Sequence, residues 1–241
     1  MSPPLFLVDA LPPTAQYRLD GPEGHHAATV QRLRAGEVIL LGDGRGGLAD
    51  ATVTAAGRGW VDVAVDAQRA VGAPDPRLTV VQGVPKGDRG ELAVQAMTEV
   101  GVDEIVPWNA ARSVAQWRGD RAAKALQRWR ATAREAAKQA RRPWLPEVGE
   151  AQGTAAVAAR FRAATSVVLH AAASARLATV ELPATGPIVV IVGPEGGIDD
   201  VELAIFEDAG AVPVRLGDAI LRTSTAGVAA LSVLSARLGR W

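Results

Sequence analysis

The fold class can be inferred from residues 188–199, Ile188-Val189-Val190-Ile191-Val192-Gly193-Pro194-Glu195-Gly196-Gly197-Ile198-Asp199. Its first five residues are a continuous apolar and β-branched run, which is typical of a strand buried on both faces of a parallel sheet. A glycine-rich turn follows, and residues 199–209 have the pattern of a helix that ends at Gly210. A buried strand that turns directly into a helix predicts an α/β domain with a mainly parallel sheet.

The rest of the chain divides into two patterns. In residues 1–72 short strands at 38–41, 48–53 and 61–65 are separated by turn residues, which predicts a small β-barrel or sandwich. The proline-containing segment 71–77 has the composition of a linker, so we predict domains at 1–72 and 73–241. The second domain alternates strands and helices. Its further predicted strands are 78–84, 103–106, 166–169 and 212–216, and its further predicted helices are 89–100, 121–142 and 225–238.

The composition excludes several classes of protein. The 241 residues contain no cysteine and three histidines, so disulfide frameworks, thiolate zinc sites, iron–sulfur clusters and cysteine nucleophiles are excluded. His25 and His26 are adjacent and have no third ligand nearby, so we expect no metal site. No apolar run reaches the length of a membrane-spanning helix and no signal-peptide pattern opens the chain, so we expect a cytoplasmic protein without a membrane partner.

Charge is distributed unevenly along the chain. The formal net charge is zero, but residues 112–142 hold ten basic and two acidic residues, a net charge of +8. In the predicted helix 121–142 the apolar face comprises Leu126, Trp129, Ala133, Ala136 and Ala140, and the basic residues occupy the opposite half. Such segregation favours a polyanionic partner. The helix 225–238 is apolar nearly all round, which suits a helix covered on both sides, with a second subunit as a natural cover.

The turn 193–197 is the first candidate site, because ligands of open α/β sheets bind at the carboxyl ends of strands. It is neither a Walker loop nor a dinucleotide-binding fingerprint, and a plain strand-to-helix turn is the alternative. The loop 216–226 is the second candidate, with Arg222 beside three hydroxyl residues. Helix capping by Thr223 or Ser224 would explain the hydroxyl groups, but a buried Arg222 would still need a partner.

Basic residues outside these loops form the third candidate, a surface for RNA phosphates. Lys86 and Arg89 begin a predicted helix, for which a solvated helix start is the alternative, and Arg32 and Arg34 suit contact with an RNA backbone. The acidic residues of 199–208 and Asp218 should lie away from RNA. The predicted RNA-binding residues are Arg32, Arg34, Lys86, Arg89, Arg112, Arg121, Lys124, Arg128, Lys138, Arg141 and Arg142.

Several motifs in this order carry a resemblance to a known family. They are His26, Val30, Arg32, Gly36, Glu37, Asp43 and Gly44, then Lys86, Arg89, Glu91, Glu99, Gly101, Val102 and Pro107, then Arg112, Ser113, Trp129, Ala136, Gln139, Arg142 and Pro146, and finally Gly193 to Gly197 with Glu202 and Leu216-Gly217 with Ile220 to Thr223 and Thr225-Ala226. Over nearly its whole length the chain resembles the RsmE family, the 16S ribosomal RNA uridine N3-methyltransferases of the trefoil-knotted SPOUT superfamily. Two departures are Thr223-Ser224-Thr225 in place of the commoner Thr-Glu-Thr, and Gln95-Ala96-Met97-Thr98-Glu99-Val100-Gly101 where the family has Lys-x-x-Glu-Leu-Gly, which removes one positive charge.

The resemblance implies an α/β SPOUT trefoil-knotted methyltransferase domain preceded by a small PUA-like RNA-binding β-barrel. It also implies a homodimer that uses S-adenosylmethionine to methylate 16S ribosomal RNA of the small ribosomal subunit. The implied cofactor-binding residues are Leu169, His170, Gly193, Pro194, Glu195, Gly196, Gly197, Leu216, Gly217, Ile220, Leu221, Arg222, Thr223 and Ala226.

The chemistry of N3 methylation suggests one catalytic residue. N3 of uridine must lose its proton, and the resulting charge spreads onto O2 and O4, where Arg222 can stabilise it. His170 suits a structural or cofactor-contacting role better than that of a base. Since the chain lacks cysteine, C5 methylation through a cysteine adduct is excluded.

Three other functions stay open at this stage. A SPOUT methyltransferase acting on a ribose 2′-oxygen is the alternative within enzymes. A PUA-type RNA-binding or ribosome-assembly factor without catalysis is the alternative outside them. A generic nucleotide-binding α/β protein is the third, and the missing Lys-Ser/Thr counts against it.

Overall fold

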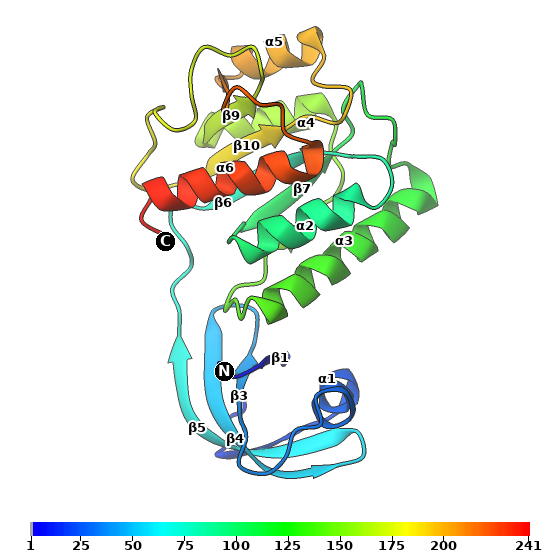
Figure 1. Cartoon of the computed structure of the whole chain (residues 1–241), viewed down its shortest axis with the longest axis vertical. Coiled ribbons are helices and arrows are strands. Elements are labelled where there is room, and N and C mark those ends of the chain that lie inside the picture. Colours follow the sequence, from blue (N-terminus) through cyan, green and yellow to red (C-terminus); the bar gives the residue numbers. More distant parts are fainter. Residues whose placement is uncertain (1) are drawn as a thin grey trace. The chain divides into compact units, whose positions relative to one another are not determined.

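The computed structural model describes residues 2–241, which form two units (Figure 1). The C-terminal unit contains Pro74–Ala136 and Pro146–Trp241, and the N-terminal unit contains the residues up to Ala73 together with Ala137–Leu145. Trp144 illustrates why this second segment belongs to the N-terminal unit, because its indole N–H donates to the carbonyl oxygens of Val71 and Gly72 at 3.0 and 3.1 Å. A single boundary in the sequence therefore does not separate the two units, because the N-terminal unit also includes the later segment Ala137–Leu145.

The N-terminal unit is built on a five-stranded sheet of order β1-β3-β4-β5-β2. The strands are β1 (Leu5–Leu7), β2 (Gln16–Leu19), β3 (Val38–Gly42), β4 (Gly47–Gly57) and β5 (Trp60–Ala70). The sequence predicted β3 to β5, each shorter than observed, and missed the two edge strands. A short helix α1 (Gly21–His25) and a π-helical turn (His26–Val30) pack near β5, and Phe6, Ile39, Leu41 and Val61 are fully buried.

The turn between β3 and β4 is explained by one side chain. The Asp43 carboxylate accepts hydrogen bonds from the backbone N–H groups of Arg45 and Gly47, at 2.7 and 2.9 Å. An aspartate that binds the backbone ahead of it closes a tight loop without help from distant residues. The predicted turn between these two strands is thereby confirmed.

The C-terminal unit is built on a six-stranded sheet of order β11-β9-β10-β6-β7-β8, in which all neighbouring strands are parallel. The strands are β6 (Leu78–Gly83), β7 (Glu104–Trp108), β8 (Glu147–Val148), β9 (Thr165–Leu169), β10 (Ile188–Val192) and β11 (Val212–Val214). The predicted parallel α/β sheet is confirmed, and β10 has the predicted bounds. The short strand β8 was not predicted, and β11 ends two residues before the predicted position, so that Leu216 lies in the loop after it.

Helices cover both faces of this sheet. The helices are α2 (Arg89–Glu99), α3 (Gly119–Gln139), α4 (Thr154–Ala159), α5 (Asp200–Asp208) and α6 (Thr223–Arg237), and a 3-10 turn (Arg160–Ala163) follows α4. Side chains of α2, α3 and α6 join one buried cluster, and those of α4 and α5 join the other. Strand β10 serves both clusters by alternation, with Ile188, Val190 and Val192 on one face and Val189 and Ile191 on the other.

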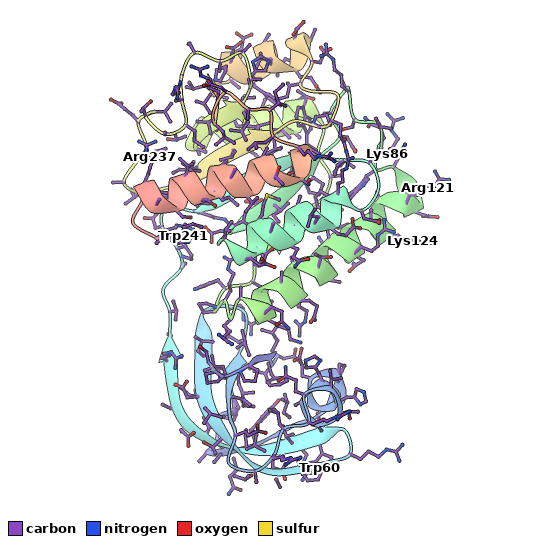
Figure 2. All side chains as sticks on the ribbon, viewed as in Figure 1. Trp60, Lys86, Arg121, Lys124, Arg237 and Trp241 are labelled. Atoms are coloured by element: carbon purple, nitrogen blue, oxygen red, sulfur yellow. The ribbon has the colours of Figure 1, made fainter. Side chains whose placement is uncertain are left out.

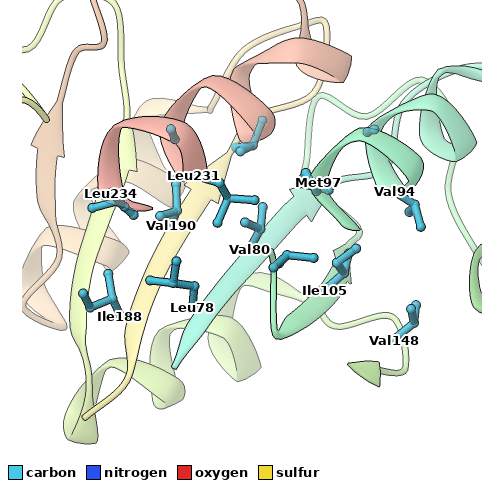
Figure 3. Close-up of a cluster of buried hydrophobic side chains, with 14 of the residues drawn as sticks. Leu78, Val80, Val94, Met97, Ile105, Val148, Ile188, Val190, Leu231 and Leu234 are labelled. Atoms are coloured by element: carbon cyan, nitrogen blue, oxygen red, sulfur yellow. The ribbon is translucent and has the colours of Figure 1, made fainter. Parts of the chain in front are cut away.

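The cluster under α6 holds the C-terminal helix onto the middle of the sheet. Leu231 and Leu234 of α6 are fully buried and point at Val190 and its neighbours on β10 and β6 (Figure 3). Burial of a leucine side chain contributes about 1.5–3 kcal/mol, so these contacts fix the helix whose first turn reaches the carboxyl end of the sheet.

Helix α3 differs from its prediction at its end. It stops at Gln139, and Arg141 has a left-handed φ of 53°. Leu126, Trp129, Ala133 and Ala136 are buried as expected. The prediction for Ala140 was wrong: this residue lies beyond the helix and is exposed, because the left-handed turn takes the chain away from the apolar face.

Candidate functional site

A cavity of about 650 Å³ lies at the carboxyl edge of the sheet in the C-terminal unit. Its walls come from the loops that follow β9, β10 and β11, together with Arg89 and Arg112. Cavities of this size are typical of small-molecule and cofactor sites. In a parallel sheet the strands' carboxyl ends meet at one edge, which explains why three loops far apart in sequence converge here.

The glycine-rich turn after β10 is shaped by two glycines. Gly197 has a φ of 76°, a conformation that side chains disfavour, and its N–H donates to the Pro194 carbonyl oxygen at 2.9 Å. Gly196 is packed so closely that a Cβ would stand 2.8 Å from the Arg112 carbonyl oxygen. The turn therefore needs both glycines to reach the start of α5, where the Asp199 side chain caps the helix by accepting from Val201 N at 3.0 Å.

Charged groups surround the turn in defined pairs. The Glu195 carboxylate accepts hydrogen bonds from the Lys86 N–H at 3.2 Å and from the Arg89 guanidinium at 3.3 Å. Arg112 pairs with Asp199, with 3.2 Å between Nη2 and Oδ2. Lys86 therefore contacts the turn through its backbone, and Arg89 and Arg112 line the cavity itself.

The last loop brings Arg222 to the cavity. Arg222 is exposed, lines the cavity and holds the N-cap position of α6. Within residues 2–241 its guanidinium has no ion pair and no hydrogen bond, so the expectation of a partner for a buried arginine does not apply: the side chain is not buried.

The capping prediction for the hydroxyl residues was wrong. The N-cap residue is Arg222, and Thr223 and Ser224 are buried inside the first turn of α6, at 6% and 4% exposure. The Thr223 hydroxyl instead donates to the Gly193 carbonyl oxygen at 2.8 Å. Helix α6 begins two residues earlier than predicted. These hydroxyl groups therefore lie in its buried first turn and not in the preceding loop.

His170 lies at the junction of two strand ends. Its backbone N–H donates to the Val214 carbonyl oxygen at 2.9 Å, its side chain is half-buried, and it lines the cavity. Leu221 and Ile220 are 40% and 86% exposed at the cavity wall. The cavity thus combines apolar side chains, backbone edges and a few charged groups, as cofactor sites do.

Comparisons with known proteins were made with this geometry in view. Residues 73–235 match the model of an RNA methyltransferase domain, and residues 19–66 match the model of an RNA methyltransferase PUA domain. The chain is 46% identical to the ribosomal RNA small subunit methyltransferase E of Mycobacterium bovis, over 98% of this chain and 93% of the relative. The chain belongs to the ribosomal RNA small subunit methyltransferase E family.

Two solved structures share the fold along almost the whole chain. The methyltransferase E structure from Neisseria gonorrhoeae, bound to S-adenosyl methionine, superposes with a TM-score of 0.86 at 28% identity and covers 98% of both chains. A methyltransferase from Legionella pneumophila in complex with the bound cofactor SAM has the same TM-score at 26% identity and the same coverage. The predicted α/β fold with a PUA-like N-terminal domain is thereby confirmed.

In this methyltransferase E family member, the implied cofactor-binding residues gather around the one cavity. All of them line it except Gly196, which faces Arg112 instead. The implied cofactor-binding residues did not include Asp200, Arg215 and Asp218, although Asp218 lies within the predicted loop 216–226 and the other two each adjoin a predicted motif. Asp200 and Asp218, which were expected to lie away from RNA, both line the cavity, and Asp218 pairs with Arg215 at 3.2 Å.

The predicted RNA-binding residues of this family member fall into different environments. Arg121 and Lys124 are exposed and lie on the same flank of the C-terminal unit as Lys86, away from Arg237 and Trp241 (Figure 2). Arg128 pairs with Glu91 at 3.3 Å. Of the predicted residues in the N-terminal unit, Arg32, Arg34 and Arg141 are exposed and Arg142 is half-buried.

Lys138 is a correction to the predicted RNA-binding face. It is 7% exposed, and its ammonium lies 3.0 Å from the Glu23 carboxylate inside the N-terminal unit. The helical wheel placed it among the basic residues, but the last turn of α3 is covered by the segment that carries Glu23. Lys138 is therefore not available to a phosphate.

Two further absences concern ligands and membranes. Residues 2–241 contain no group of three or more His, Asp or Glu side chains placed to bind a metal ion. In the same range, the helices all fall short of the length and hydropathy needed to cross a bilayer.

Proposed function

We propose that this chain is an S-adenosylmethionine-dependent methyltransferase that modifies N3 of a uridine in 16S ribosomal RNA of the small subunit. The observation that carries the proposal is the convergence of three loops on one cavity, with Arg222 exposed at its wall. Its relatives are named for methylation of small subunit ribosomal RNA, and two similar structures hold S-adenosylmethionine.

The cavity residues suit this cofactor. A volume of about 650 Å³ accommodates a nucleoside-sized ligand, and the glycine-rich turn presents backbone groups without side chains in the way. Leu169, Leu216, Leu221 and Ala226 offer apolar surface to the cofactor. His170, Gly193, Pro194, Glu195, Gly197, Gly217, Ile220 and Thr223 complete the set of proposed cofactor-binding residues, and Gly196 supports them from behind.

Arg222 carries the proposed catalytic role. When bound, S-adenosylmethionine supplies an electrophilic methyl group on a sulfonium. The protein must then hold the uracil ring in line and stabilise the charge that appears on O2 and O4 when N3 loses its proton. Because no carboxylate pairs with the Arg222 guanidinium within residues 2–241, its N–H donors are available to those oxygens. The Watson–Crick edge must be reachable, so the target uridine is unpaired or flipped out of its helix.

The exposed basic residues supply the proposed RNA surface. Arg121, Lys124 and Arg128 on α3 lie in the same unit as the cavity, and Lys86, Arg89 and Arg112 lie at or beside its wall. Phosphate contacts of this kind position the RNA without reading its sequence. Arg32, Arg34, Arg141 and Arg142 extend the proposed contacts to the PUA-like unit.

We further propose that the protein works in the cytoplasm as a homodimer and that its C-terminal segment is knotted. The outward side of α6 supports the dimer, because its residues there are small or apolar: Ala229, Ser232 and Val233 are half-buried and Ala236 is exposed. A second copy would cover this face. Sedimentation of the wild type and of Ala236→Glu tests it, since a dimer through α6 should be weakened by a buried charge.

The deciding experiment is nucleoside analysis and fragment mass spectrometry of 16S RNA from cells with and without this protein. Loss of 3-methyluridine at one position is the expected result. Loss of a 2′-O-methylnucleoside instead would contradict the proposal in favour of ribose methylation. Calorimetry with S-adenosylmethionine tests the non-catalytic alternative. We expect a heat of binding, whereas a pure RNA-binding module should show none.

A further inference from the structure

Gln82 is a fully buried polar residue at the end of the strand next to β10. It is the penultimate residue of β6, its exposure is 0%, and it pairs in register with Val192, the last residue of β10. A buried amide is costly unless it is hydrogen-bonded. Its contacts therefore show what it does in the fold.

The Gln82 amide begins a chain of hydrogen bonds with one direction. Its Nε2 donates to the Thr223 hydroxyl at 2.9 Å and to the Gly83 carbonyl oxygen at 3.1 Å. The Thr223 hydroxyl in turn donates to the Gly193 carbonyl oxygen at 2.8 Å. Since a hydroxyl has one proton, and Thr223 gives it to Gly193, Thr223 can only accept from Gln82. The amide thus sets the direction of the hydroxyl.

This chain ties together three segments that meet at the cavity. Gly83 approaches the glycine-rich turn so closely that a Cβ would stand 2.6 Å from Pro194 N. Arg222 is fixed to the first turn of α6, because its carbonyl oxygen accepts from the N–H groups of Thr225 and Ala226 at 2.9 Å. The position of Arg222 relative to the Gly193 turn therefore depends on the Thr223 hydroxyl.

The side-chain oxygen of Gln82 indicates that this residue does more than stabilise the fold. Gln82 Oε1 is buried and has no hydrogen-bond partner within residues 2–241. An unsatisfied buried acceptor is destabilising, and an apolar side chain of the same length would avoid it. Gln82 thus combines an unsatisfied acceptor, which lowers the stability of the fold, with a donor that sets the direction of the Thr223 hydroxyl.

We propose that Gln82 is a positioning residue, which locks α6 to the glycine-rich turn through Thr223 and so holds Arg222 in place for methyl transfer. The inference rests on the proposed function. Gln82 touches neither cofactor nor RNA in this role, and Thr223 is the residue through which it acts.

The test is a double-mutant cycle on the full-length protein, with 16S RNA from cells that lack it as substrate. Gln82→Leu removes the donor and the unsatisfied oxygen together, and Thr223→Val removes the hydroxyl. We expect kcat of Gln82→Leu to fall about 10- to 100-fold, as small displacements of a catalytic group do, while the Kd for S-adenosylmethionine changes less than about threefold. The Tm should not fall.

The cycle separates positioning from a general structural effect. If Gln82 acts through Thr223, the double variant loses no more kcat than Thr223→Val alone. Additive losses of kcat, or a Tm that falls along with kcat, would overturn the inference. Gln82→Met, which matches glutamine more closely in length, repeats the test if the leucine variant does not fold.

The two proposals fail in different ways. A wild type that binds no S-adenosylmethionine and leaves 16S RNA unmodified contradicts the proposed function. A wild type that methylates 16S RNA, together with a Gln82→Leu variant of unchanged kcat, contradicts only the role of Gln82.

Discussion

The carbonyl oxygen of Arg112 lies 2.8 Å from the point where a Cβ of residue 196 would stand, so Gly196 and Arg112 are in contact between two different loops. The Arg112 loop is also held from behind, because the Glu202 carboxylate accepts from Ala111 N at 2.9 Å and from the Thr154 hydroxyl at 2.7 Å. The wall of the cavity is therefore a packed unit of two loops.

Gly196→Ala should disturb this wall. A Cβ at that position must push the Arg112 backbone or the turn, and such overpacking costs about 1–3 kcal/mol. We expect the affinity for S-adenosylmethionine, measured by calorimetry, to fall about tenfold. Gly149→Ala is the control, because the nearest atom to its Cβ would be 3.9 Å away. Equal affinities of the two variants would contradict the close packing.

Arg222→Ala should abolish methylation and leave cofactor binding nearly intact. Loss of a group that stabilises developing charge lowers kcat by about 10²-fold or more. Single-turnover methylation of 16S RNA and calorimetry with S-adenosylmethionine measure the two effects, and we expect the Kd to stay within a few-fold of wild type. Arg222→Lys, which keeps the charge, should retain part of the activity. Complete loss of cofactor binding in Arg222→Ala would make Arg222 a cofactor-binding residue instead.

Lys138→Met should destabilise the N-terminal unit. It removes the cation that lies 3.0 Å from the Glu23 carboxylate, and both side chains are largely buried, at 7% and 14% exposure. Removing one partner of a buried pair costs about 3 kcal/mol, which urea denaturation would detect. Lys124→Met is the control, because this exposed lysine should change the free energy of unfolding by less than about 0.5 kcal/mol. A similar small effect of both substitutions would show that Lys138 is not held in the interior.

Arg121→Ala and Lys124→Ala should weaken RNA binding in a salt-dependent way. Each phosphate contact that is lost should lower the slope of log K against log salt concentration by about 0.7–0.9. Filter binding with a 16S RNA fragment at several salt concentrations measures the slope. Arg162→Ala serves as the control, because Arg162 is exposed but lies outside the proposed surface. An unchanged slope in the α3 variants would show that this face of the helix does not contact RNA phosphates.

Asp62→Asn should lower stability at neutral pH but not in acid. Hydrogen bonds from Arg18, at 2.7 and 2.8 Å, hold the pKa of the Asp62 carboxyl below its ordinary value of 3.8. A lowered pKa means that the stabilising effect is present above the unfolded pKa and is lost as the pH falls through the folded value. The Tm of wild type should exceed that of the variant at pH 7, and the difference should shrink as the pH falls below the ordinary value of 3.8 and through the lowered pKa of Asp62. Curves that stay parallel throughout the acid range would rule out this linkage.

Local features of the sequence predicted much of the scaffold. The apolar run of β10, the helix patterns of α2, α5 and α6 and the aspartate turn after β3 depend on residues close in sequence, so periodicity and turn chemistry were sufficient. The edge strands β1 and β2 and the short helix α4 were missed. Their few residues carry a weak pattern and are stabilised by partners far along the chain.

Three features follow from the sequence alone: Gly193 to Gly197 come after a buried strand, Arg222 precedes an apolar helix, and positive charge is concentrated between residues 112 and 142. Which charged groups face solvent and which polar groups touch depends on the tertiary structure. Lys138 is buried because a segment more than a hundred residues away brings Glu23 against it. Gln82 reads as an ordinary strand residue until Thr223, 141 positions later, packs beside it. A helical wheel or a strand pattern records the face on which a side chain lies, whereas the neighbour that covers that face is chosen by the packing of the whole chain.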